Sequence, residues 1–89
     1  MNIKVYVPVI VAYDTDGRMQ PFRIRWENGE VYKIDRILDV RPAPALKAGG
    51  QGDRYTAQIE GRKSYLFYES CTDSSGEVKG RWFVERRRM

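Results

Sequence analysis

The dipeptide Asn28-Gly29, set between two runs of β-branched and aromatic residues, constrains the fold more than any other part of this chain. Asn-Gly is a preferred central pair in β-hairpin turns, because both residues tolerate a positive φ. Two further junctions of this kind occur at Asp16-Gly17 and Gly61-Arg62. The chain is therefore expected to fold as a meander of antiparallel strands.

Loop length decides which side chains share a face, because strand side chains alternate between the two faces of a sheet. For the first hairpin we predict an even loop at Asp16-Gly17, of two or four residues. The two-residue loop pairs Val9 with Ile24 and Val11 with Phe22, and the four-residue loop, 14–17, keeps the same parity, so that in both cases the apolar sides of the two strands meet. An odd loop is excluded on this reasoning.

The second hairpin leads to the opposite prediction. A two-residue loop at Asn28-Gly29 would turn Lys33 toward the core. A three-residue loop, Glu27 to Gly29, instead pairs Ile24 with Tyr32 and leaves glycine in the left-handed position of a bulge. We therefore expect the three-residue loop.

Glycine also marks two places in the second half of the chain. Gly61-Arg62 suits a two-residue turn with Glu60 opposite Lys63. Gly80, inside the last strand-like run, suggests a bulge or a close approach of another backbone.

These runs predict an all-β protein: a single small antiparallel β-barrel of about six strands. A Src-homology-3-like barrel is the first choice, an oligonucleotide-fold-like barrel the second, and an open sheet covered by dimerisation the third. Residues 1–85 are expected to form the domain and residues 86–89 a basic C-terminal tail. The Pro- and Gly-rich segment 42–52 allows at most one helical turn, around 45–48; a flexible connection and an anion-binding loop are both open for it.

Composition argues against catalysis and metal binding. The chain has 89 residues, one cysteine and no histidine, so the commonest general base and the commonest metal ligand are both missing. Cys71 lies among acidic and hydroxyl residues, which do not activate a thiol. We expect a non-enzymatic protein without cofactor or metal. No apolar run is long enough for a membrane helix and no signal peptide is evident, which predicts a cytoplasmic protein.

The net charge of +4 is concentrated at the C-terminus. Arg86, Arg87 and Arg88 supply three of the excess charges, so residues 1–85 are nearly neutral. The register above nevertheless gathers Arg23, Arg25 and Lys33 on one outer face. Basic residues interleaved with apolar and aromatic ones are typical of single-stranded nucleic acid binding. The alternative is an ordinary solvated face, with the charges compensated by Asp35 or Glu27.

The aromatic residues of the second half divide between two faces. The predicted core of this half consists of Tyr55, Leu66, Tyr68, Trp82 and Val84. The opposite face then carries Tyr65, Phe67 and Phe83, a set typical of a contact surface for another protein or a second copy of the chain. The segment around Leu46 could instead fold over them. Binding of an anionic polymer and protein–protein contact are thus the two functions that the sequence leaves open.

Three strings give the chain a wider resemblance. They are Pro21 to Val40 with Trp26 and Gly29, Leu46 to Gly52 followed by Arg54-Tyr55-Thr56, and Arg81 to Glu85. In these strings the chain resembles small uncharacterised bacterial β-barrel proteins, a family of unknown function. The resemblance implies a compact bacterial domain and carries over no activity, partner or site residue.

Overall fold

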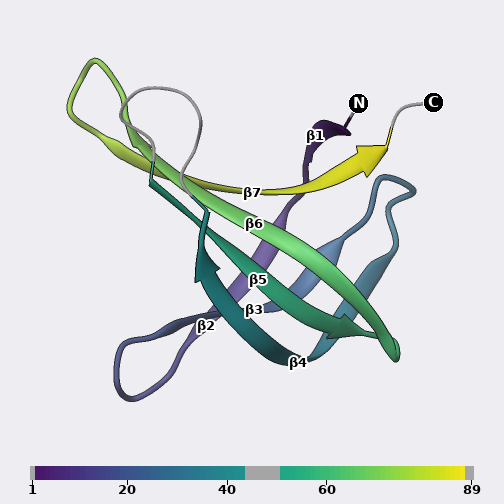
Figure 1. Cartoon of the computed structure of the whole chain (residues 1–89). Helices are drawn as coiled ribbons and strands as arrows, with labels where there is room; N and C mark the ends of the chain where they lie inside the picture. The colour runs from purple at the N-terminus through teal and green to yellow at the C-terminus, as the bar shows by residue number, and fades with distance from the viewer. Residues whose placement is uncertain (1, 44–50, 88–89) are drawn as a thin grey trace.

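The computed structural model describes residues 2–43 and 51–87, which form seven strands and no helix. The strands are β1 (Asn2–Tyr6), β2 (Val9–Tyr13), β3 (Met19–Arg25), β4 (Val31–Pro42), β5 (Gln51–Ile59), β6 (Arg62–Thr72) and β7 (Val78–Arg87). Every paired neighbour is antiparallel, and the sheet curls into a half-barrel (Figure 1). The all-β barrel prediction is confirmed, with seven strands instead of six. The described residues include no helix long and apolar enough to cross a membrane.

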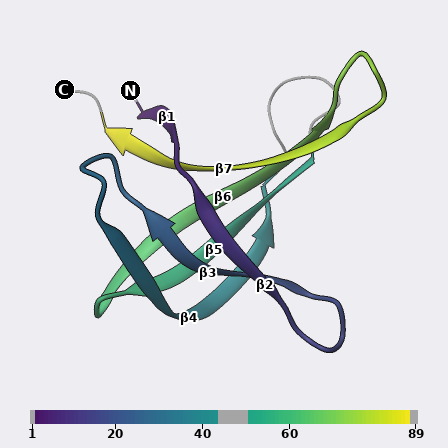
Figure 2. The ribbon, with the colours of Figure 1, turned by 180° about the vertical axis from the view of Figure 1, so that it is seen from behind.

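The sheet has the order β1-β7-β6-β5-β4-β3-β2, so β1 and β2 are its two end strands. The chain runs directly from β1 into β2, because the curled sheet brings these two ends together (Figure 2). Only Val7 and Pro8 separate them. The Val7 amide donates to the Trp82 carbonyl of β7 at 3.0 Å, and the Pro8 carbonyl accepts from the Arg25 amide of β3 at 3.0 Å. Because proline has no N–H to donate, the ladder changes partner here. This break splits the predicted first strand and accounts for the seventh.

Three of the hairpins share one loop design, with three residues between the last hydrogen-bonded pair. The loops are 15–17, 27–29 and 74–76, and each ends in a glycine with a φ of 82° to 88°. In the second loop, the Gly29 amide donates to the Trp26 carbonyl at 2.9 Å, and the Trp26 amide donates to the Glu30 carbonyl at 2.8 Å. This is a type I turn followed by a glycine bulge. The predicted 27–29 loop is confirmed, and Ile24 lies opposite Tyr32.

The first hairpin corrects a prediction, because its loop is odd. Val9 pairs with Ile24 as expected, but Val11 pairs with Pro21 instead of Phe22. A bulge between these two pairs leaves Phe22 as an extra residue on β3 and restores the parity that the odd loop reversed. Counting loop residues alone could not exclude an odd loop, since a bulge shifts the alternation by one.

The β5–β6 turn lies one residue earlier than predicted. Its central residues are Glu60 and Gly61, with φ of 50° and 77°, which is a type I′ turn. The register consequently places Tyr55 opposite Leu66. Because the pairing moves by two residues in total, every side chain keeps its predicted face. The Asp35 carboxylate accepts a hydrogen bond from the Gly61 amide at 3.0 Å and fixes the turn to β4.

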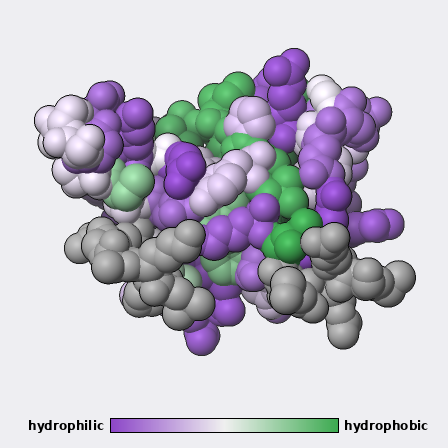
Figure 3. All heavy atoms as spheres, turned by 90° about the horizontal axis from the view of Figure 1, so that it is seen from above, coloured by the Kyte–Doolittle hydropathy of each residue, from purple (hydrophilic) through white to green (hydrophobic). Residues whose placement is uncertain are grey.

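The core lies on the concave side of the sheet. Its buried members are Val7, Ile24, Ile34, Tyr55, Ala57, Leu66, Trp82 and Val84, with Tyr68 partly buried against them. Seen from above, hydrophobic residues also reach the surface in the middle of the molecule, between hydrophilic flanks (Figure 3). The half-barrel therefore covers its core incompletely.

The C-terminal boundary also differs from the prediction. Strand β7 continues to Arg87, with Arg86 opposite Ile3 of β1. The Arg86 guanidinium forms an ion pair with Glu27 in the β3–β4 loop, which lies beside the end of β7 in both ribbon views (Figures 1 and 2). Arg86 and Arg87 thus belong to the sheet and not to a tail. The expected helical turn at 45–48 lies outside the described residues.

Candidate nucleic-acid interface

Strands β3 and β4 place the predicted basic residues together on the outer face. Arg23 lies directly opposite Lys33, and Arg25 lies two residues further along β3. Their neighbour Ile24 is 2% exposed and points into the core, so alternation directs the arginines outward. All three cationic side chains are exposed. The predicted juxtaposition is present in the structure.

Phe22 joins this cluster, although the sequence analysis placed it in the core. The bulge at this residue brings its ring to the outer face, where it is 40% exposed. The Arg23 guanidinium lies 5.2 Å and the Lys33 ammonium 6.0 Å from the ring centroid. Pro21 was the available signal, because proline inside a strand is confined to edges and bulges. The phenyl ring is therefore an aromatic platform between two cations.

The acids expected to neutralise these cations are engaged elsewhere. Glu27 pairs with Arg86, and the Asp35 carboxylate accepts the Gly61 amide. Within residues 2–43 and 51–87, no ion pair involves Arg23, Arg25 or Lys33. Like charges directly opposite each other on a sheet are destabilising. The repulsion between Arg23 and Lys33 is thus not offset by an ion pair from the described part of the chain.

An apolar hollow of about 210 Å³ lies beside the basic cluster. Its lining consists of Pro8, Val9, Ile10, Arg23, Ile24, Arg25 and Val31. Ile10 and Val31 are more than half exposed. Two of the three cations, Arg23 and Arg25, thus border an apolar surface on which a nucleobase could lie.

The C-terminal arginines do not extend this cluster in the described structure. Arg86 is paired with Glu27. Arg87, in β7, lies opposite Asn2 of β1, and Arg88 is outside the described residues. Their part in binding stays a prediction.

The second predicted contact surface is largely used within the chain. Phe83 is 8% exposed, because its ring stacks on Phe67 at 5.0 Å and meets Tyr6 edge-on at 5.7 Å. The Lys4 ammonium lies 4.6 Å from the Phe83 ring. Of the three predicted contact residues, Tyr65 alone is strongly exposed, at 46%. The three rings share the outer face as predicted, but the expected exposure of Phe83 is wrong.

The Glu69 carboxylate, which is partly buried, binds three side chains beside this aromatic row. The Tyr6 hydroxyl donates to Glu69 at 2.6 Å, and this hydrogen bond, with a smaller effect of burial, raises the pKa of Tyr6 above its usual value. Lys4 and Arg81 lie 3.8 and 4.0 Å from the same carboxylate. The row on β1, β6 and β7 is consequently compensated within the chain, whereas the cluster on β3 and β4 is not.

The described residues contain no group of three or more acidic or cysteine side chains placed to hold a metal ion. Cys71 is half-buried and unbonded to another cysteine. The comparisons with family models, with curated proteins and with solved structures found no match. The candidate site is therefore argued from its own geometry.

Proposed function

We propose that the protein binds single-stranded nucleic acid, or an anionic polymer of similar charge spacing, through the outer face of β3 and β4. The contact residues are Phe22, Arg23, Arg25 and Lys33. The observation that supports this most is the pair of facing cations, Arg23 and Lys33, left without an acidic partner in the described structure around an exposed aromatic ring. Phosphates bound at these cations, one to each, would remove the repulsion, and Phe22 would stack on a base.

The charges predict how affinity responds to salt. Each phosphate contact on a single strand releases condensed counterions and contributes about −0.7 to the slope of log K against log salt. Three cations at the cluster predict a slope near −2 for this face alone. We expect fluorescence anisotropy with a labelled oligothymidine to show this dependence, and salt-independent binding would contradict the proposal.

Single substitutions separate the contributions of charge and of stacking. Arg23→Ala is expected to weaken binding and to reduce the salt slope by roughly one contact. Phe22→Ala is expected to weaken binding roughly 5- to 100-fold at an unchanged slope, because base–aromatic stacking contributes about 1–3 kcal/mol. Phe22→Tyr keeps the ring and should retain affinity.

The matched control is Arg41→Ala, on strand β4. It removes the same charge, but its guanidinium is already paired with Asp39 at 2.7 Å. We expect little change in affinity or slope. If Arg41→Ala and Arg23→Ala weakened binding equally, net charge and not this cluster would be the cause.

A further inference from the structure

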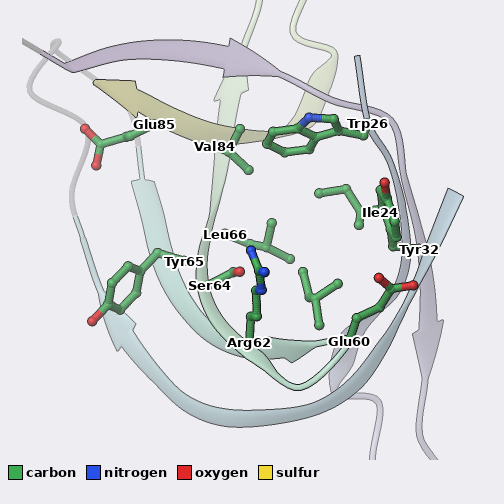
Figure 4. Close-up of a pocket in the computed structure, with 11 residues that line it drawn as sticks. Ile24, Trp26, Tyr32, Glu60, Arg62, Ser64, Tyr65, Leu66, Val84 and Glu85 are labelled. Atoms are coloured by element: carbon green, nitrogen blue, oxygen red, sulfur yellow. The ribbon is translucent and has the colours of Figure 1, made fainter. Parts of the chain in front are cut away.

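A pocket of about 740 Å³ opens at the end of the half-barrel, inside the β3–β4 hairpin and the β5–β6 turn (Figure 4). Its apolar floor is formed by Ile24, Ile59, Leu66 and Val84, and its aromatic walls by Trp26 and Tyr32. The volume lies within the range of about 300–1,000 Å³ that is common for ligand sites, which often occupy barrel mouths. The pocket is separate from the outer basic face.

Trp26 lines the pocket and is the residue that follows the basic cluster in the chain. It follows Arg25 in the chain at the end of β3, and its indole is 37% exposed. Figure 4 shows the indole along one side of the opening, across from the β5–β6 turn. Such a ring offers a flat surface on which a planar ligand can stack. Arg25 faces outward and Trp26 faces the pocket, so a nucleic-acid strand bound at Arg25 reaches this ring by passing round the end of β3.

Two opposite charges rise from the β5–β6 turn toward this space. Glu60 and Arg62 both line the pocket, with Arg62 directed toward its middle and Glu60 lying near Tyr32 (Figure 4). Neither forms an ion pair with any residue that the structure describes. A carboxylate only accepts hydrogen bonds and a guanidinium only donates them. A ligand that matches both side chains therefore presents two neighbouring donors to the Glu60 carboxylate and an acceptor to the Arg62 guanidinium.

We infer that this pocket takes one nucleobase of the bound strand and that the base is guanine. Guanine presents two neighbouring donors, N1–H and the N2 amino group, to one carboxylate, and its O6 oxygen accepts beside them. The Watson–Crick edges of adenine, cytosine and thymine lack two donors on adjacent atoms. Glu60 would accept from N1 and N2, Arg62 would donate to O6, and Trp26 would stack on the ring. The inference rests on the proposed function and adds a base-specific site next to the basic face on β3 and β4.

The test compares an oligothymidine with the same oligonucleotide carrying one central guanine, and with matched strands carrying a central adenine or cytosine, by anisotropy and by quenching of tryptophan fluorescence. We expect the wild-type chain to bind the guanine-containing strand about tenfold more tightly, because a bidentate pairing discriminates by about 1–3 kcal/mol. Glu60→Gln should remove this preference while leaving affinity for oligothymidine nearly unchanged. The matched control is Glu85→Gln, which makes the same change in charge at a pocket residue directed away from the space (Figure 4).

The outcomes distinguish the two proposals. Three results would overturn the guanine site alone. The wild-type chain could bind the oligothymidine and the guanine-containing strand with equal affinity, or it could prefer adenine or cytosine at the central position. Glu60→Gln and Glu85→Gln could also lose the preference for guanine equally. Absence of binding to either strand would overturn the nucleic-acid proposal and this site with it. Thermal unfolding of both variants near the wild-type midpoint shows that the fold is intact; if Glu60→Gln unfolds early, Arg62→Lys gives the same comparison without altering the turn.

Discussion

The space beside Gly80 is filled by another residue of the same sheet. A Cβ built at this glycine would lie 2.2 Å from the hydroxyl oxygen of Tyr68 and 2.8 Å from two of its ring carbons. The tyrosine ring lies against the core and packs on Trp82, with ring centroids 5.0 Å apart. Gly80 thus marks a close approach, but by an aromatic side chain that covers a bare backbone position and not by another backbone, as the sequence had suggested.

Gly80→Ala is accordingly expected to lower the free energy of unfolding by about 1–3 kcal/mol, the range for overpacking at a filled site. Urea unfolding followed by tryptophan fluorescence measures the loss. Tyr68→Leu in the Gly80→Ala background should recover part of it, because the shorter side chain vacates the contested space. A fully stable Gly80→Ala chain would show that the ring moves away without cost.

Among the elements, the hairpins most clearly combine sequence signal and geometry. The glycine at the end of each three-residue loop takes a left-handed conformation that other residues adopt with strain. The residue before the β6–β7 loop adds a side-chain cap: the Asp73 carboxylate accepts from the amides of Ser75 and Glu77 at 2.9 and 3.0 Å. Asp14 makes the same two bonds in the β2–β3 loop. These turns are readable from sequence because their chemistry is local.

The cap at Asp73 gives the β6–β7 hairpin a pH dependence. The Ser75 hydroxyl, followed by the Glu77 amide, holds the pKa of Asp73 below its usual value. A lowered pKa in the folded state stabilises the protein at pH values above the ordinary carboxyl pKa, and this contribution is lost as the pH falls through the lowered one. Asp73→Asn, which cannot ionise, should therefore melt earlier than wild type at neutral pH.

Melting curves across an acid pH series measure this difference. The gap between wild type and Asp73→Asn is expected to narrow on acidification and to vanish once the wild-type carboxyl is protonated. Asp16→Asn removes the same charge in the β2–β3 loop, outside the cap, and is the matched control for the loss of one negative charge. A gap that does not change with pH would mean that the amide differs from the carboxylate for reasons other than ionisation.

For the whole molecule, local patterns predicted more of the fold than of the candidate site. The alternation of side chains identified most of the core, and the correctly counted 27–29 loop gave the opposition of Arg23 and Lys33. The outward turn of Phe22 escaped prediction, since a bulge is a response to two strands that must be matched in space. The Arg86–Glu27 pair escaped for a related reason: it joins residues brought together only when the sheet curls. Contacts between strands that are far apart in the sequence cannot be predicted from any single segment of the chain.

Because the sheet curls, the last residues of β7 help to hold β1 in place. Arg86 and Arg87 pair with Ile3 and Asn2, at the edge of the sheet that β1 provides. A chain ending at Glu85 loses these pairings and the ion pair to Glu27. The ion pair is 40% to 49% exposed, so it contributes at most about 1 kcal/mol, and most of the effect should come from the lost strand pairing. We expect faster amide hydrogen exchange throughout β1 and a melting temperature lower by several degrees.

A full-length chain with Arg86→Gln, Arg87→Gln and Arg88→Gln separates charge from strand pairing. Glutamine keeps the backbone ladder, so slow exchange in β1 should persist, while the salt slope of oligonucleotide binding would fall only if these arginines contact phosphate. If the truncated chain instead exchanged as slowly as the full-length chain, β1 would be held by its pairing to residues 83–85 alone. Residues 86–89 would then be a dispensable tail, and closure of the half-barrel would depend on the continuity of the chain at Val7 and Pro8.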